Sequence, residues 1–283
     1  MDAVFCDYDD TPPRAPQVND FRLLEDGTLW IRAGDFQPDA AGMAALQTML
    51  AALARLPSPR RIVFDARGNL GGNSGFGEAI FQAATGGLVF EEDGLERLPR
   101  TQAFWRVSGL GIVALEARTS EFRARLGPDD ALVRSQEAFI LQLRVALARG
   151  ERWLEQGVGQ PMLDAGELVR RHAHLARFAG PVALVTDDRC ASACLDFADR
   201  VRSVPGSLHL GETTEFDSVY LDIGWITLPS GNALTLPLKV WRNRPRGNDQ
   251  PWVPQVPLKV TGVDDTTVRA EVLDALRPSA LRR

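Results

Sequence analysis

Ser192 lies where a strand-like segment turns into a helix, in the stretch ALVTDDRCASACLDFAD. The serine opens the predicted helix, whose first N–H groups and dipole stabilise negative charge. A serine in this place can act as a nucleophile, with the N–H of Ala193 as a donor to the oxyanion of an acyl-transfer intermediate. Serine is equally a favoured N-cap residue, so a purely structural role is the alternative.

A glycine pair, Gly71 and Gly72, follows a second apolar segment, in the stretch IVFDARGNLGG. Glycine lets the backbone approach a ligand closely and adopt conformations that other residues avoid. The N–H groups of this pair could therefore supply further oxyanion donors. The alternative is a strand-to-helix turn that needs glycine for its geometry alone.

A serine nucleophile needs a base, and the sequence offers few candidates. The only lysines are Lys239 and Lys259, which lie far from Ser192 in the sequence. His209 falls in a predicted strand beside a glycine turn and is a candidate base. The two remaining histidines, in the stretch RRHAHLARF, are interpreted as ordinary helix-surface or capping residues.

Composition excludes several classes of function. The chain has 283 residues, a net charge of −5 and no basic block, so we expect no nucleic-acid partner. No apolar run approaches 18 residues, so no membrane span is predicted. The N-terminus lacks the pattern of a signal peptide. The localisation is left open, because the chain could be cytoplasmic or part of a longer periplasmic or secreted precursor.

Three cysteines are too few for a disulfide framework. Cys190 and Cys194 could lie one helical turn apart beside Ser192, and we interpret them as small packing residues. No His/Cys pair follows at ligand spacing, so no metal is expected. The stretch GNLGGNSGFG lacks a Walker lysine and the G-x-G-x-x-G spacing, so no nucleotide cofactor is expected either.

Strand and helix patterns alternate along the chain, which favours an α/β fold. We predict strands at residues 28–36, 60–68, 207–214, 219–228 and 232–241, and helices at residues 40–56, 77–87, 190–204 and 264–276. Residues 174–188 are predicted to contain the end of a helix followed by a buried strand. Two further helices are predicted at residues 113–125 and 129–156. The predicted organisation is a lead-in (1–20), a first part of the core (21–99), a helical insertion or lid bordering the groove (100–156) and a second part of the core (157–283).

Three segments in register resemble the S41 peptidases, the C-terminal-processing and tricorn-like serine proteases. The family pattern D-x-R-x-N-x-G-G is matched by Asp65, Arg67, Asn69, Gly71 and Gly72. Its nucleophile segment is matched around Ser192, with Asp196 near the family's Glu, and its G-E-x-T segment by Gly211, Glu212 and Thr214. The resemblance implies a ClpP/crotonase-like core of stacked β-α units with a helical insertion. We expect Asp65 and Arg67 to position the glycine loop rather than to take part in the chemistry.

The sequence departs from this family at the base. The C-terminal-processing branch has a lysine about twenty-five residues after the nucleophile, where this chain has Asp217. The tricorn-like branch has a histidine well upstream of the nucleophile. Asp217 could instead orient an imidazole from a segment preceding the chain, with help from Ser218 or Tyr220.

The sequence therefore predicts a serine-type peptidase of the S41 class that acts on a peptide or protein substrate. Ser192 and Asp217 are its catalytic candidates, and the oxyanion donors are Gly71, Gly72 and Ala193. Two alternatives remain open: a non-catalytic S41-like peptide-binding domain, and another acyl-transfer activity on a crotonase-like core. The sequence does not indicate an oligomeric state.

Overall fold

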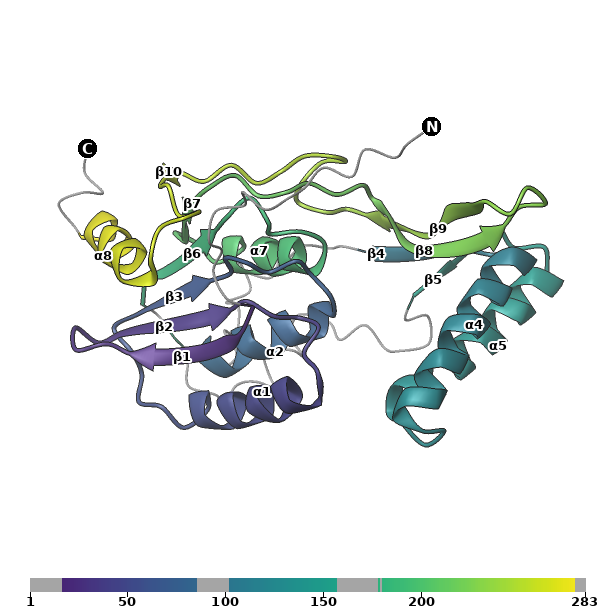
Figure 1. Ribbon diagram of the computed structural model, residues 1–283, viewed down its shortest axis with the longest axis horizontal. Coiled ribbons are helices and arrows are strands. Elements are labelled where there is room, and N and C mark those ends of the chain that lie inside the picture. Colours follow the sequence, from purple (N-terminus) through teal and green to yellow (C-terminus); the bar gives the residue numbers. More distant parts are fainter. Residues whose placement is uncertain (1–16, 86–101, 157–177, 179, 278–283) are drawn as a thin grey trace. The chain divides into compact units, whose positions relative to one another are not determined.

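The computed structural model describes residues 17–85, 102–156, 178 and 180–277 (Figure 1). The chain forms two compact units. The first comprises Met1–Leu98, Leu163–Asp217 and Gln250–Arg283, and the second comprises Pro99–Met162 and Ser218–Asp249. Each described helix is too short or too polar to cross a membrane.

The first unit contains a six-stranded sheet in the order β1-β2-β3-β6-β7-β10. Its strands are β1 (Asn19–Leu23), β2 (Thr28–Ala33), β3 (Arg61–Asp65), β6 (Val182–Thr186), β7 (Leu208–Gly211) and β10 (Val256–Pro257). β1 is antiparallel to β2, and all other neighbours are parallel. The carboxyl ends of β2, β3, β6 and β7 therefore meet at one edge of the sheet.

Helices cover both faces of this sheet. Successive residues of a strand point to opposite faces, so an apolar strand packs against helices on both sides. Ile62 and Phe64 of β3 join the larger apolar cluster, together with α1 (Ala40–Leu53), α2 (Ser74–Thr85) and α7 (Ala193–Arg202). Val63 joins a second cluster with residues of α8 (Asp265–Ala275). The side chain of Asp264 accepts hydrogen bonds from the N–H groups of Thr266 and Thr267 and so caps the start of α8.

The second unit pairs a four-stranded antiparallel sheet with two long helices. Its strands are β4 (Gln102–Arg106), β5 (Trp153–Glu155), β8 (Tyr220–Thr227) and β9 (Ala233–Arg242), in the order β5-β4-β9-β8, and its helices are α4 (Gly109–Leu126) and α5 (Ala131–Ala148). An apolar cluster around Trp105 and Leu115 lies between them. β8 and β9 were predicted to belong to the second part of the core, whereas β9 pairs with β4 in the second unit.

The predicted α/β class is confirmed at this coarse level, since the structure mixes parallel and antiparallel strands with helices. Four short strands, β1, β4, β5 and β10, were not predicted.

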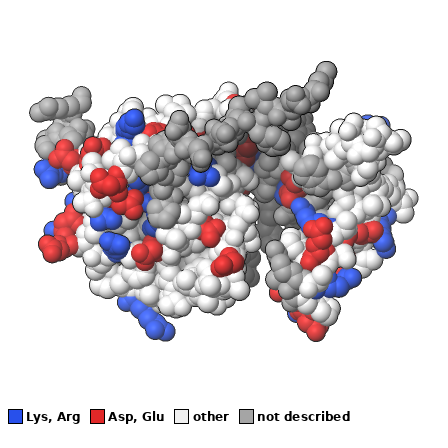
Figure 2. All heavy atoms as spheres, viewed as in Figure 1, with Lys and Arg blue, Asp and Glu red and all other residues white. Residues whose placement is uncertain are grey.

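On the face shown in Figure 2, acidic and basic side chains are interspersed rather than gathered by sign.

Candidate functional site

Two turns that are far apart in the sequence lie side by side in the first unit. One follows β3 and the other follows β6, and these strands are parallel neighbours with Asp65 opposite Val185. The backbone N–H of Gly68, in the first turn, donates to the carboxylate of Asp187, in the second, over 2.9 Å. Asp187 is buried and also accepts from the N–H of Arg189, so it links the two turns.

Gly71 approaches the serine segment so closely that only glycine fits. A Cβ atom at Gly71 would lie 2.8 Å from Cβ of Ser192 and 2.7 Å from the carbonyl oxygen of Ala191. Its φ of +93° is also one that side chains disfavour. The glycine turn therefore lies directly against the serine segment.

Gly72 is a glycine for a different reason. Its φ is +131°, and a Cβ there would lie 2.1 Å from the carbonyl oxygen of Phe36. The same carbonyl accepts from the N–H of Asn73 over 2.9 Å. This half of the glycine pair thus lets the turn pack against the chain that follows β2.

Ser192 has an unusual backbone conformation for its place at the start of α7. Its φ is +52° and its ψ is −119°, outside the extended region that N-cap residues normally occupy. A non-glycine residue in such a conformation costs on the order of 1 kcal/mol. The side chain makes no capping hydrogen bond, so the N-cap alternative does not describe this serine.

The hydroxyl of Ser192 is partly exposed and makes no hydrogen bond within the described part of the chain. This places a nucleophile-type side chain beside Gly71 at the carboxyl edge of the sheet. It also means that none of Asp217, His209 and Lys259, which belong to the same unit, reaches the hydroxyl. The two other histidines, His172 and His174, lie outside the described residues.

The three candidate oxyanion donors differ in their present hydrogen bonds. The N–H of Gly71 already donates to Oδ1 of Asn69 over 2.8 Å. The N–H groups of Gly72 and Ala193 donate to no described residue. For Ala193 this is expected, because it is the first residue of α7 and the first N–H groups of a helix have no partner within the helix. The nitrogen of Ala193 would lie 3.1 Å from a Cβ atom at Gly71, so it faces the same turn.

Asn69 holds the glycine turn from inside. Its side chain is fully buried, accepts from Gly71 and donates to the carbonyl of Ala33 over 2.7 Å. The resemblance marked Asn69 as part of a motif without giving it a role. Asp187 was not singled out, although an Asp two residues before a turn N–H is a known local signal.

Asp65 and Arg67, which were expected to position the glycine loop, form a buried ion pair with each other. Arg67 donates to both carboxylate oxygens of Asp65, and Arg32 and Trp30 donate to the same carboxylate. Burial opposes the charge of Asp65, but these hydrogen bonds and the nearby cations hold its pKa below the usual value. Arg67 also bonds Asp265, so the pair anchors the start of α8 and does not touch the glycine pair directly.

His209 is fully buried and uses both ring nitrogens away from Ser192. Nδ1 lies 2.9 Å from Nη1 of Arg202 and therefore accepts, which leaves Nε2 to donate to Oγ1 of Thr186 over 2.7 Å. Burial first, and then the charge of Arg202, lower the pKa of His209 from 6.5 to about 3. This neutral imidazole is a fixed part of the core that links β7 to α7 and β6.

The other candidate residues have these surroundings. Asp217 is half-buried at the end of a segment of the first unit. Lys239 belongs to the second unit, where it forms an ion pair with Asp222. Glu212 of the G-E-x-T match accepts from the N–H groups of Val260 and Thr261, so it ties down the loop before α8. Within the described ranges, no cluster of three or more His, Cys, Asp or Glu side chains could hold a metal.

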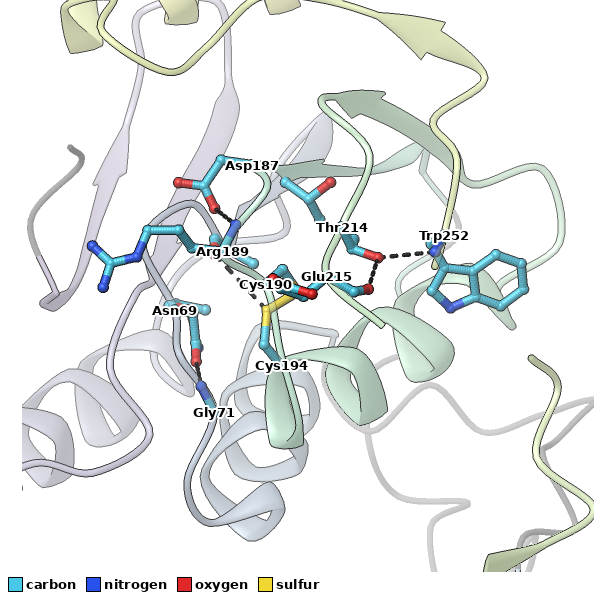
Figure 3. The surroundings of a disulfide bond; sticks show 12 residues. Asn69, Gly71, Asp187, Arg189, Cys190, Cys194, Thr214, Glu215 and Trp252 are labelled. Atoms are coloured by element: carbon cyan, nitrogen blue, oxygen red, sulfur yellow. Dashed lines mark hydrogen bonds between the residues drawn. A yellow bond between two sulfur atoms is a disulfide. The ribbon is translucent and has the colours of Figure 1, made fainter. Parts of the chain in front are cut away.

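Cys190 and Cys194 form a disulfide, which corrects their interpretation as separate packing residues. Their Cα atoms are 5.2 Å apart, and both residues are fully buried. Figure 3 shows Asn69 and Gly71 on one side of the bridge and Thr214 and Trp252 on the other. A four-residue spacing puts two side chains on one helical face, but the sequence alone did not distinguish contact from a covalent bond.

Comparison with known proteins gives no matching family model and no matching curated protein. Solved structures show a distant likeness. A lipoprotein from Streptococcus agalactiae has a TM-score of 0.46 at 12% identity, over 92% of this chain and 70% of that one. Mature CPAF in complex with lactacystin has a TM-score of 0.49 at 13% identity, over 91% of this chain and 53% of that one.

The photosystem II D1 C-terminal processing protease has a TM-score of 0.39 at 12% identity, over 82% of this chain and 42% of its own. This chain therefore spans about half the length of both CPAF and the processing protease. None of the three similarities reaches a TM-score of 0.5. The function is accordingly inferred from the residues and geometry of this chain.

Proposed function

We propose that this chain is a serine hydrolase of the S41 type, built on a ClpP/crotonase-like core, that cleaves peptide bonds with Ser192. The observation that carries the proposal is the conformation of Ser192. At the start of a helix a serine can satisfy a backbone N–H by capping it, yet this one adopts a positive φ and leaves its hydroxyl without a capping bond. A hydroxyl held in this way is available for attack on a carbonyl carbon.

The proposed reaction begins with a new bond between Oγ of Ser192 and the carbonyl carbon of the substrate. The carbonyl electrons move to the oxygen, which the N–H groups of Ala193 and Gly72 stabilise as donors that have no other described acceptor. Gly71 contributes its shape rather than its N–H, which Asn69 already uses. Collapse of the intermediate then breaks the C–N bond, and the leaving nitrogen takes the proton that the base removed from Ser192. Water, activated by the same base, then hydrolyses the ester on Ser192 and releases the second product as a carboxylic acid.

The hydroxyl proton of Ser192 must pass to a base, and His209 is unsuited because its Nδ1 lone pair accepts from Arg202. We propose that the imidazole comes from outside the described residues and that Asp217 orients it. His172 and His174 are the two histidines of this sequence that lie outside the described residues. The helical part of the second unit, at residues 100–156, is proposed to act as a lid that borders the groove.

A non-catalytic S41-like peptide-binding domain is the second candidate. It is favoured by one observation, which is that no described base contacts the hydroxyl of Ser192. Such a domain would keep the glycine turn and the edge of the sheet for a peptide. Another acyl-transfer activity on a crotonase-like core is the third candidate, and it shares the chemistry of the first step.

Covalent labelling separates the candidates. The purified chain is treated with a fluorophosphonate probe, and the labelled peptide is identified by mass spectrometry. A peptidase or another acyl-transfer enzyme that uses this serine is labelled at Ser192, and Ser192→Ala removes the label. Ser203→Ala serves as the matched control, because Ser203 ends the same helix and its hydroxyl bonds only the carbonyl of Arg200 among described residues. A folded wild-type chain that does not label at Ser192 would exclude the hydrolase.

The variants His172→Ala and His174→Ala, labelled in the same way, test the source of the base. Loss of labelling in one of them, with the protein still folded, would identify the missing imidazole. Labelling that persists in both would overturn the proposal that either histidine acts as the base. Release of fragments from a peptide library then distinguishes a peptidase from another acyl transferase.

A further inference from the structure

The disulfide between Cys190 and Cys194 closes a ring of five residues with Ser192 at its centre. The two cysteines are fully buried and belong to the larger apolar cluster, whereas Ser192 between them is partly exposed. Sγ of Cys194 lies 3.9 Å from the carbonyl oxygen of Ala66, at the start of the turn that follows β3. Both ends of the serine turn are thus fixed in the core, and only its tip faces solvent.

The bridge restricts the conformations that Ser192 can adopt. A disulfide requires Cα atoms within about 7 Å, and here they are 5.2 Å apart. An N-cap residue is extended, and each extended residue carries the chain about 3.3–3.6 Å onward, away from the helix. The covalent ring therefore opposes the extended conformation in which the hydroxyl would cap α7.

Other contacts close the turn but do not replace the bridge. Gly71 packs on Ala191 and Ser192 from one side, which prevents the turn from moving toward the glycine loop. Nothing in that contact prevents movement in the opposite direction. Without the covalent ring, a positive φ and an uncapped helix would both favour relaxation of Ser192 into an ordinary N-cap.

We propose that the Cys190–Cys194 disulfide is a positioning device that holds Ser192 in its nucleophilic conformation and makes the reactivity of Ser192 dependent on redox state. This inference rests on the proposed hydrolase function. Reduction requires a dithiol: its thiolate attacks one sulfur, the S–S bond breaks, and the second thiol resolves the mixed disulfide. Two protein thiols and one oxidised dithiol result. Because both sulfurs are buried, this exchange is slow in the folded chain.

The first test counts thiols. The oxidised chain is unfolded in urea without reductant and alkylated, and one alkylated cysteine, Cys6, is expected. After treatment with dithiothreitol three are expected. Three alkylated cysteines in protein that was never reduced would overturn the proposal, because the bridge would then be absent in solution.

The second test compares the rate of fluorophosphonate labelling among the oxidised chain, the dithiothreitol-treated chain and the Cys190→Ala/Cys194→Ala variant. We expect labelling to fall at least 10-fold in the last two and to return when the reduced wild type is reoxidised. Cys6→Ala, which leaves the bridge intact, is the control and should label at the wild-type rate. Equal labelling with and without the bridge would overturn the proposal.

A third measurement does not depend on activity. In protein labelled with ¹³C and ¹⁵N at serine, the Cα and Cβ shifts of Ser192, assigned with Ser192→Ala, report the sign of φ. We expect them to move toward N-cap values on reduction, and unchanged shifts would contradict the positioning role. If these shifts move although the oxidised chain never labels, the positioning role stands and the hydrolase function fails. Should the double variant not fold, reversible reduction of the wild type supplies the same comparison.

Discussion

His209 should make the first unit lose stability as the pH falls from 7 to 5. In the folded chain, burial and the charge of Arg202 lower the pKa of the imidazole from 6.5 to about 3. The unfolded chain regains the ordinary value, so it binds more protons between these two pH values. The contribution of the neutral ring to the free energy of unfolding is therefore complete above about pH 6.5 and is lost progressively as the pH falls toward 3.

The size of the effect follows from the two pKa values. Each pH unit below the unfolded value corresponds to about 1.4 kcal/mol of the free energy of unfolding, which gives about 2 kcal/mol between pH 7 and pH 5. The measurement stops at pH 5 because the lowered pKa of Asp65 adds a further loss that develops below about pH 5. Two groups face the ring nitrogens, Arg202 from α7 and Thr186 from β6, and neither changes charge in this window.

His209→Gln removes the titration and keeps a polar side chain. We expect the variant to be less stable than the wild type at pH 7, but to lose about 2 kcal/mol less between pH 7 and pH 5 in urea unfolding. His172 and His174 are present in both proteins and cancel in the difference. A resonance of the His209 ring that titrates above pH 6, or a variant with unchanged pH dependence, would refute the reasoning.

Two further predictions concern the glycine turn. Gly71→Ala should lower fluorophosphonate labelling at least 10-fold, because the new Cβ would overlap the serine turn, whereas Gly206→Ala, also at positive φ but with open space around it, should label normally. Asn69→Ala should lower the free energy of unfolding by about 2–4 kcal/mol, because it leaves two buried backbone groups unpaired. Asn73→Ala removes the same kind of bond from an exposed turn and should cost under about 1 kcal/mol. A loss as large in Asn73→Ala as in Asn69→Ala would contradict the role of burial.

The elements that carry the site were predictable because their sequences are locally consistent. β3 and β6 are short apolar runs that end at polar turn residues. α7 begins directly after Ser192, where a helix was predicted to open. β1 was not predicted, because its sequence NDFRL has the polar composition of a loop and becomes a strand only by pairing with β2. β4 and β5 were not predicted for another reason, since their partners lie far away in the sequence or across a long helical hairpin.

Tertiary contacts decided the features of the site that were not predicted. The position of His209 in a predicted strand made it a candidate base, but the side chain is fully buried and its Nδ1 accepts from Arg202 of α7. The bond between Cys190 and Cys194 depends on the exact geometry of the turn around Ser192. Sequence spacing allows the contact without requiring the bond.

The conformation of Ser192 bears directly on the choice between a hydrolase and a binding domain. A binding domain gains nothing from a serine at positive φ, and capping α7 instead would recover about 1 kcal/mol. The chain nevertheless holds this serine in the less stable conformation. Gly71 packs directly against it, where a larger residue would not fit, and the disulfide joins Cys190 and Cys194 on either side of it. Strain that several independent contacts maintain is typical of functional sites. The combination therefore favours the hydrolase, with a base still to be supplied, over a groove that only binds.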